Sequence, residues 1–146
     1  MKDEFLSRSE EDTRAYAYSL GKTLPSCALI TLSGDLGAGK TAFIKGLAAG
    51  YAGISEHEVS SPTFSYLHIY EKNRTVYHFD LYRLKCANDF FDAGFDEYLK
   101  LDGITCIEWA ERIMPQLPTL SLNHWINIQI AHKTPTSRLI KWDRRA

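Results

Sequence analysis

Cysteine is scarce in this chain, and its three cysteines form no recognisable framework. Cys27, Cys86 and Cys106 are odd in number, and no two of them form a C-x-x-C pattern. This argues against a disulfide scaffold and against a cysteine-bound zinc site, and it suits a reducing cytoplasm. Cys27 and Cys106 fall in strand-like runs, which predicts that both are small core residues.

The sequence also lacks a membrane or secretion signal and a strong charge of one sign. No apolar run approaches the roughly 20 residues that span a bilayer, and the first residues lack the apolar core of a signal peptide. The formal net charge of −1 provides no global field that would favour nucleic acid. We therefore expect a cytoplasmic protein without a membrane partner, and its length of 146 residues predicts one domain over residues 1–146.

One glycine-rich octapeptide indicates a nucleotide site. Residues 34–41 read G-D-L-G-A-G-K-T and fit the phosphate-loop pattern G-x-x-x-x-G-K-[ST]. In such a loop, glycines let backbone N–H groups approach phosphate, the lysine supplies charge to the β- and γ-phosphates, and the hydroxyl binds Mg²⁺. A turn that merely links a strand to a helix would not require the lysine and threonine. The predicted nucleotide-binding residues of the loop are Gly34, Asp35, Leu36, Gly37, Ala38, Gly39, Lys40 and Thr41.

The elements around the octapeptide predict an α/β fold. A buried type of strand precedes it at 28–32, and the helix that follows at 40–49 is expected to end at Gly50. A capping box that begins at Ser9 predicts a helix that ends at Gly21. The other predicted elements are a hairpin (64–70 and 75–81), a helix broken at Gly94 (88–99), a short helix (109–114) and three strands (103–108, 123–131 and 138–142). Together they predict a three-layer phosphate-loop NTPase fold, with a mixed, mostly parallel sheet of about seven strands flanked by helices.

Two acidic residues end apolar strands and complete the predicted site. Ligands gather at strand C-termini in open α/β sheets, and Asp80 and Glu108 both stand there. Glu108 follows four residues of buried strand and is the better Mg²⁺ ligand, which makes Asp80 the better candidate for orienting water. Thr63 precedes the hairpin and can approach Mg²⁺ or the γ-phosphate. We predict catalytic roles for Lys40, Thr63 and Asp80, and metal binding by Thr41, Glu108 and Asp80; a helix cap or an ion pair is the alternative for each carboxylate.

Four motifs together make the chain resemble the TsaE family of small bacterial ATPases. They are the phosphate loop, Ser-Pro-Thr-Phe at 61–64, His-Phe-Asp-Leu-Tyr-Arg at 78–83 and Ile-Glu-Trp-Ala-Glu-Arg at 107–112. The resemblance extends over the whole chain in order and spacing. It implies an Mg²⁺-dependent enzyme that hydrolyses ATP slowly on its own. It also implies work with the TsaD and TsaB proteins, which form threonylcarbamoyladenosine beside the tRNA anticodon; tRNA would be reached only through that complex.

The resemblance also implies site residues beyond the phosphate loop. Thr63, Asp80, Glu108 and Trp109 take the family's positions near the metal, although Trp109 could equally stack on a base or pack under the site. For the base pocket we expect walls at the start of the N-terminal helix, near Glu11. The opposite wall is expected after the strand 123–131, near His132 and Lys133.

Other functions and surfaces remain open at this point. A small phosphate-loop kinase usually carries an arginine-rich lid, and a GTPase needs N-K-x-D; the sequence shows neither. A nucleotide-gated binding module with incidental hydrolysis is a further possibility. A basic cluster over 138–145 suits RNA or an acidic partner, or, as we expect, a solvated strand edge. The aromatic and acidic segment 88–99 suits docking on TsaB–TsaD, or, as we expect, a helix pair that covers the sheet.

Overall fold

A computed structural model describes residues 2–120, 122 and 124–145, which form a seven-stranded sheet of order β1-β7-β6-β2-β5-β4-β3. The strands are β1 (Lys2–Ser7), β2 (Ala28–Ser33), β3 (Leu67–Glu71), β4 (Thr75–Asp80), β5 (Ile104–Glu108), β6 (His124–Thr134) and β7 (Ser137–Arg145). The α-helices are α1 (Glu10–Gly21), α2 (Lys40–Ala52) and α3 (Ala87–Asp92). Short 3-10 helices are η1 (Glu56–Glu58), η2 (Phe95–Lys100), η3 (Ala110–Arg112) and η4 (Met114–Thr119).

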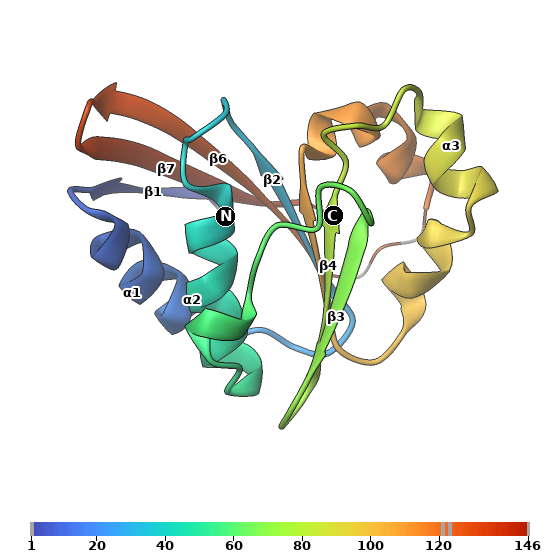
Figure 1. The fold of residues 1–146 in the computed structure, drawn as a ribbon, viewed down its shortest axis with the longest axis horizontal. Helices are drawn as coiled ribbons and strands as arrows, with labels where there is room; N and C mark the ends of the chain where they lie inside the picture. The colour runs from blue at the N-terminus through green and yellow to red at the C-terminus, as the bar shows by residue number, and fades with distance from the viewer. Residues whose placement is uncertain (1, 121, 123, 146) are drawn as a thin grey trace.

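Helices cover the sheet on both faces, as Figure 1 shows: α1, α2 and η1 lie on one side, and α3 with η2, η3 and η4 lies on the other. The central strands β6, β2, β5 and β4 pair in parallel, and antiparallel pairs add β7 and β1 at one end and β3 at the other. The predicted three-layer α/β fold is confirmed. The predicted strand 123–131 corresponds to β6, although Asn123 lies outside the described residues.

Alternation along the central strands assigns their side chains to two cores. Ile126, Ile128 and Ile130 belong to the core beneath α1 and α2, together with alternate residues of β2 and β5. Residues with the opposite orientation, such as Phe79 and Ile107, join the core beneath α3. This alternation is what a sheet buried on both faces requires.

The contact between α1 and α2 explains why one predicted helix end is wrong. Gly50 does not end α2, which continues to Ala52 and is capped by Gly53 in the left-handed region (φ 71°). A Cβ atom on Gly50 would lie 2.2 Å from the carbonyl oxygen of Tyr18 in α1. The glycine therefore serves close helix packing, a role that the local sequence does not distinguish from a helix stop.

Three further expectations from the sequence differ from the structure. The strand β1 was not predicted, and it pairs with β7, so the basic segment 138–145 lies inside the sheet rather than along an edge. Cys106 is buried as expected, but Cys27 is exposed and takes a left-handed conformation (φ 64°). The predicted short helix 109–114 is replaced by the two 3-10 helices η3 and η4.

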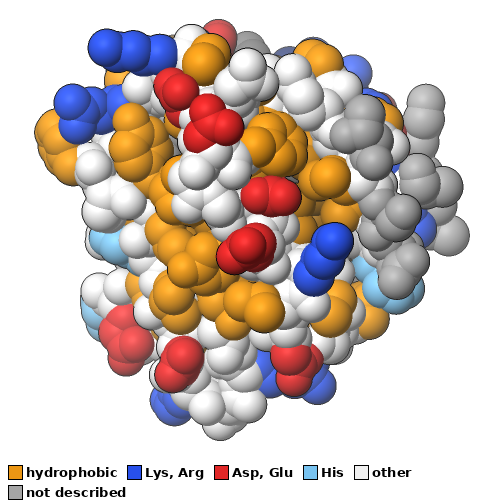
Figure 2. Space-filling view, turned by 90° about the vertical axis from the view of Figure 1, so that its right-hand side faces the viewer, with side chains coloured by type: hydrophobic (Ala, Val, Ile, Leu, Met, Phe, Trp, Pro, Cys, Tyr) orange, Lys and Arg blue, Asp and Glu red, His pale blue; other side chains and the backbone are white. Residues whose placement is uncertain are grey.

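The segment 88–99 covers the sheet, and the predicted break at Gly94 is confirmed by its left-handed backbone (φ 77°) between α3 and η2. Phe90 and Phe95 pack on Phe79 of β4, with ring centroids 5.6 Å and 5.2 Å away. On this side of the molecule, Figure 2 shows apolar side chains gathered in the middle with acidic side chains among and around them. No helix of the described residues is long and apolar enough to cross a membrane.

Candidate nucleotide-binding site

The phosphate loop joins the C-terminus of β2 to the N-terminus of α2. Gly37 (φ 77°) and Gly39 (φ 109°) take left-handed conformations that other residues rarely adopt. Gly39 is the N-cap of α2 and provides no side-chain hydrogen bond, so the first amides of the helix remain donors for an anion. The local geometry therefore suits phosphate, at the end of the helix where the positive pole of its dipole lies.

Lys40 is folded back across this loop. Its Nζ atom donates to the carbonyl oxygens of Gly34 at 2.6 Å and Asp35 at 2.9 Å, and it lies 4.1 Å from the ring centroid of Trp109. The residue is only 5% exposed. Burial lowers the pKa of Lys40, and the nearby carboxylates, Glu108 foremost, oppose that shift. A buried ammonium in this position is favoured further by any anion that binds at the loop.

The two predicted carboxylates are neighbours in the sheet. Asp80 ends β4 and Glu108 ends β5, and the two residues are register partners in a parallel pair. The Thr41 hydroxyl donates to Glu108, with Oγ1 3.0 Å from Oε1 and 3.2 Å from Oε2. The side chain of Glu108 thus faces the start of α2, where the phosphate loop ends.

Asp80 is held instead by the segment that precedes the hairpin. Its Oδ2 atom accepts hydrogen bonds from the hydroxyls of Thr63, at 2.9 Å, and Ser61. Its Oδ1 atom accepts the backbone N–H of Tyr82 at 2.9 Å. Asp80 therefore ties residues 61–63 to the end of β4, whereas Glu108 is tied to α2, so the two carboxylates have different partners.

These oxygen donors fit Mg²⁺ only in company with a nucleotide. Among the described residues, no group of three or more His, Cys, Asp or Glu side chains could hold a metal ion. Mg²⁺ prefers oxygen ligands and is commonly held by one or two carboxylates plus substrate phosphates. Thr41 and Glu108, placed beside the phosphate loop, supply such a partial set.

His78 is a buried member of the site that was not among the predicted site residues. Its Nε2 atom lies 2.6 Å from Oε2 of Glu108, and its Nδ1 atom lies 3.1 Å from the hydroxyl of Tyr70. Strand periodicity was the available signal: His78 and Asp80 are two residues apart, so their side chains share one face of β4. Ser61, the first residue of the Ser-Pro-Thr-Phe motif, is a further residue of the site that was not predicted; it bonds Asp80.

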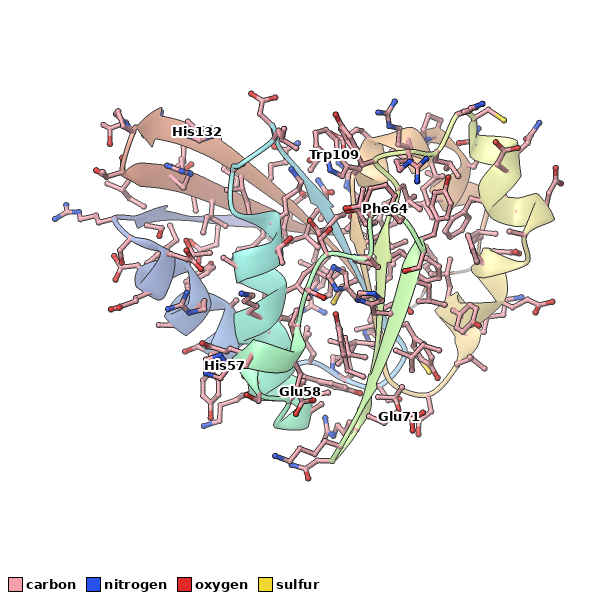
Figure 3. The ribbon with its side chains drawn as sticks, in the orientation of Figure 1. His57, Glu58, Phe64, Glu71, Trp109 and His132 are labelled. Atoms are coloured by element: carbon pink, nitrogen blue, oxygen red, sulfur yellow. The ribbon has the colours of Figure 1, made fainter. Side chains whose placement is uncertain are left out.

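A cavity of about 830 Å³ brings the predicted residues together. Its lining includes the following residues predicted from the sequence: Leu36, Gly37, Ala38, Gly39, Lys40, Thr41, Thr63, Asp80, Glu108 and Trp109. Gly34 and Asp35 do not line it and contribute through their bonds to Lys40. Figure 3 shows Trp109 near the end of the central strands that carries the phosphate loop.

The three residues predicted for the base pocket, Glu11, His132 and Lys133, do not line this cavity. Other residues near the start of α1 line the cavity in place of Glu11, and residues at and after the β6–β7 turn line it in place of His132. These lining residues are Arg8, Ser9, Glu10, Thr13, Pro135, Thr136 and Arg138. Figure 3 shows His132 out on the paired strands β6 and β7. The predicted segments thus reach the cavity, but through other side chains, because the helix start and the strand turn set which residues face inward.

Arg138 reaches the phosphate loop from β7. Its Nε atom donates to the carbonyl oxygen of Ala38 at 3.1 Å, and an Nη atom lies 3.4 Å from the carbonyl oxygen of Gly37. The basic C-terminal segment therefore contributes one residue to the candidate site. No local pattern indicates this contact, which joins residues a hundred positions apart in the chain.

Known proteins are similar to this chain in sequence and in fold. A family model described as threonylcarbamoyl adenosine biosynthesis protein TsaE matches residues 7–140. A tRNA threonylcarbamoyladenosine biosynthesis protein TsaE from Treponema pallidum is 45% identical over 113 residues, which cover 77% of this chain and 82% of that protein. Its namesake from Bacillus subtilis is 41% identical over 109 residues, 74% of this chain and 66% of that protein.

A solved structure agrees with the sequence comparisons. The crystal structure of Bacillus subtilis YdiB matches with a TM-score of 0.75 and 29% identity, covering 97% of this chain and 84% of that one. The family model matches most of the chain, and the relatives share more than 30% identity over most of their length. The chain therefore belongs to the TsaE family of threonylcarbamoyladenosine biosynthesis proteins.

Proposed function

We propose that this protein binds ATP with Mg²⁺, hydrolyses it slowly, and thereby supports the formation of threonylcarbamoyladenosine in tRNA. The observation that supports this proposal is one cavity lined by the phosphate loop, its lysine and two carboxylates at strand ends. The family and the printed names of its relatives supply the pathway. ATP is favoured over GTP because the chain has no N-K-x-D motif.

Each side chain has a role that follows from its position. Lys40 pairs with the β- and γ-phosphates, and the amides at the start of α2 bind the same anion. Thr41 and Glu108 would hold Mg²⁺, and the bound ion would neutralise negative charge on the phosphates. Asp80, hydrogen-bonded to Thr63, orients the attacking water. Trp109 packs against Lys40 and forms part of the wall.

A partner complex of TsaD and TsaB is proposed to use this site, with tRNA reached only through that complex. Thr63 is the link in this proposal, because it bonds Asp80 inside the cavity while its neighbour Phe64 is 82% exposed. The Phe64 ring lies 4.8 Å from the guanidinium carbon of Arg83. A protein seated on this exposed ring would shift Thr63 and so alter turnover.

The direct test is ATP turnover by the protein alone and with TsaB–TsaD and tRNA. We expect Lys40→Ala to abolish ATP binding, measured by calorimetry. Asp80→Asn and Glu108→Gln should reduce turnover more than nucleotide affinity, because both residues act on the metal or on water. Wild-type turnover in both carboxylate variants would overturn the site assignment. An unchanged rate in the presence of the partners would favour an independent hydrolase or kinase.

A further inference from the structure

The geometry points to His78 as a positioning residue, which fixes the Glu108 carboxylate in the orientation that binds a divalent cation. This inference rests on the proposed function, since that cation would be bound together with the nucleotide. Among the described residues, the side-chain hydrogen bonds of His78 are with Glu108 and Tyr70, not with Thr41 or the phosphate loop, and its ring also packs edge-on against His68. It would therefore act through Glu108 rather than on the reacting atoms.

Burial makes the contact between the two side chains restrictive. The side chain of His78 is 0% exposed and that of Glu108 is 4% exposed, with 2.6 Å between Nε2 and Oε2. The other carboxylate oxygen, Oε1, accepts the Thr41 hydroxyl at 3.0 Å. Each oxygen thus has a protein donor from a different element, β4 on one side and α2 on the other. A carboxylate held at both oxygens has little freedom to rotate.

The hydrogen-bond pattern shows which ring nitrogen of His78 faces the carboxylate. A carboxylate that binds a cation is ionised and only accepts hydrogen bonds, so Nε2 of His78 carries a hydrogen. At the other side of the ring, Nδ1 lies 3.1 Å from the hydroxyl oxygen of Tyr70, which donates its hydrogen to the carbonyl oxygen of Ser60 at 3.0 Å. The Tyr70 oxygen in turn accepts the backbone N–H of Ser60 at 3.2 Å.

This arrangement connects Glu108 with the segment that carries Thr63. A series of hydrogen bonds runs from the Ser60 amide through the side chains of Tyr70 and His78 to Glu108. The side chain of Tyr70 is itself buried. Residues 61–63 are bound separately to Asp80. Both carboxylates are therefore tied to the same short segment, directly in one case and through two aromatic side chains in the other.

Loss of an outer partner of a metal ligand commonly lowers metal affinity about 10- to 100-fold. We therefore expect His78→Leu, which removes the donor and keeps an apolar side chain, to weaken Mn²⁺ binding to the complex with a non-hydrolysable ATP analogue by about that factor. Mn²⁺ affinity is measured by electron paramagnetic resonance. His78→Gln keeps an amide donor near the position of Nε2 and should bind Mn²⁺ more tightly than His78→Leu. Affinity for the analogue in EDTA should be unchanged in both variants.

A matched control separates positioning from general destabilisation. Thr31→Val removes another buried hydrogen-bonding group, which bonds Asn127 at 2.8 Å and Trp125 at 2.9 Å on the other face of the sheet. It should leave Mn²⁺ affinity at the wild-type value. If His78→Leu does not fold, Tyr70→Phe removes the hydroxyl at Nδ1 and should weaken Mn²⁺ binding in the same direction.

Three results would overturn the inference while leaving ATP binding intact. These are wild-type Mn²⁺ affinity in His78→Leu, or in Tyr70→Phe where it is the variant used; equal weakening in Thr31→Val; and no rescue by His78→Gln. Glu108→Gln is the reference for a damaged metal site and should weaken Mn²⁺ binding in every case. If the wild-type protein binds neither the analogue nor Mn²⁺, the proposed function fails and the inference fails with it.

Discussion

Replacing Arg138 with alanine should weaken ATP binding about 5- to 30-fold, although this residue lies outside every nucleotide motif. The guanidinium donates to the Ala38 carbonyl at 3.1 Å and reaches the Gly37 carbonyl at 3.4 Å. The carbonyl and the following amide of a trans peptide point in opposite directions. Holding the Ala38 carbonyl therefore directs the amide of Gly39 the other way, and Gly39 lines the cavity.

The magnitude follows from the number and quality of these contacts. A hydrogen bond to a charged group contributes about 1.5–3 kcal/mol when it is well formed and shielded. Arg138 is only half-buried and its second contact is long, so we assign about 1–2 kcal/mol to both contacts together. This free energy corresponds to about 5- to 30-fold in the dissociation constant.

Calorimetric titration with ATP, with Mg²⁺ and again in EDTA, measures this change. Lys141→Ala and Arg144→Ala are matched controls, because both remove an exposed cation from β7 that forms no hydrogen bond with the loop. Both controls should bind ATP like wild type. Unchanged affinity in Arg138→Ala would refute the argument, and an equal loss in the controls would assign the effect to the field of the whole basic segment.

Two further predictions concern stability without nucleotide. Burial lowers the pKa of Lys40 below its ordinary value of 10.5, so the unfolded state binds more protons just below that value. The wild type should therefore gain stability relative to Lys40→Met as the pH rises toward 10.5. Urea unfolding at several pH values checks this, and a constant difference between the two proteins would contradict it. Gly50→Ala should lower the free energy of unfolding by about 1–3 kcal/mol, because the new Cβ atom would lie 2.2 Å from the Tyr18 carbonyl oxygen. Helix propensity alone would instead raise it by about 1 kcal/mol. Greater resistance of the variant to urea would contradict the close approach of α1 and α2.

The parts of the fold that local sequence predicts are those with strong local signals. The octapeptide 34–41 has glycines at positions that require left-handed backbone, a buried strand before it and a helix after it. Asp80 and Glu108 each end an apolar run, and the usual placement of ligands at the C-termini of parallel strands predicts that they meet. Both features depend on a few consecutive residues, so a single amino-acid sequence is enough to predict them.

Features that depend on distant pairing were missed. The strand β1 is short and carries acidic residues, and its pairing with β7 is what moves the basic segment 138–145 away from an edge. The contact of Arg138 with the phosphate loop requires that same placement of β7 beside β6. For Glu11 and His132, the prediction had the correct segments but not the inward-facing residues, because a shift of one position along a helix or strand changes the direction of the side chain.

The register of β4 against β5 places both carboxylates and His78 on the same face of the sheet. In the observed pairing, Asp80 lies opposite Glu108 and His78 opposite Cys106, so all four side chains share the α2 face of the sheet. A slip of β4 by one residue would turn His78 and Asp80 to the opposite face. It would also bring Phe79, a core residue beneath α3, to the side of α2. The apolar core thus enforces the register that places His78 against Glu108, and a variant that preserves this core should retain the geometry of the site.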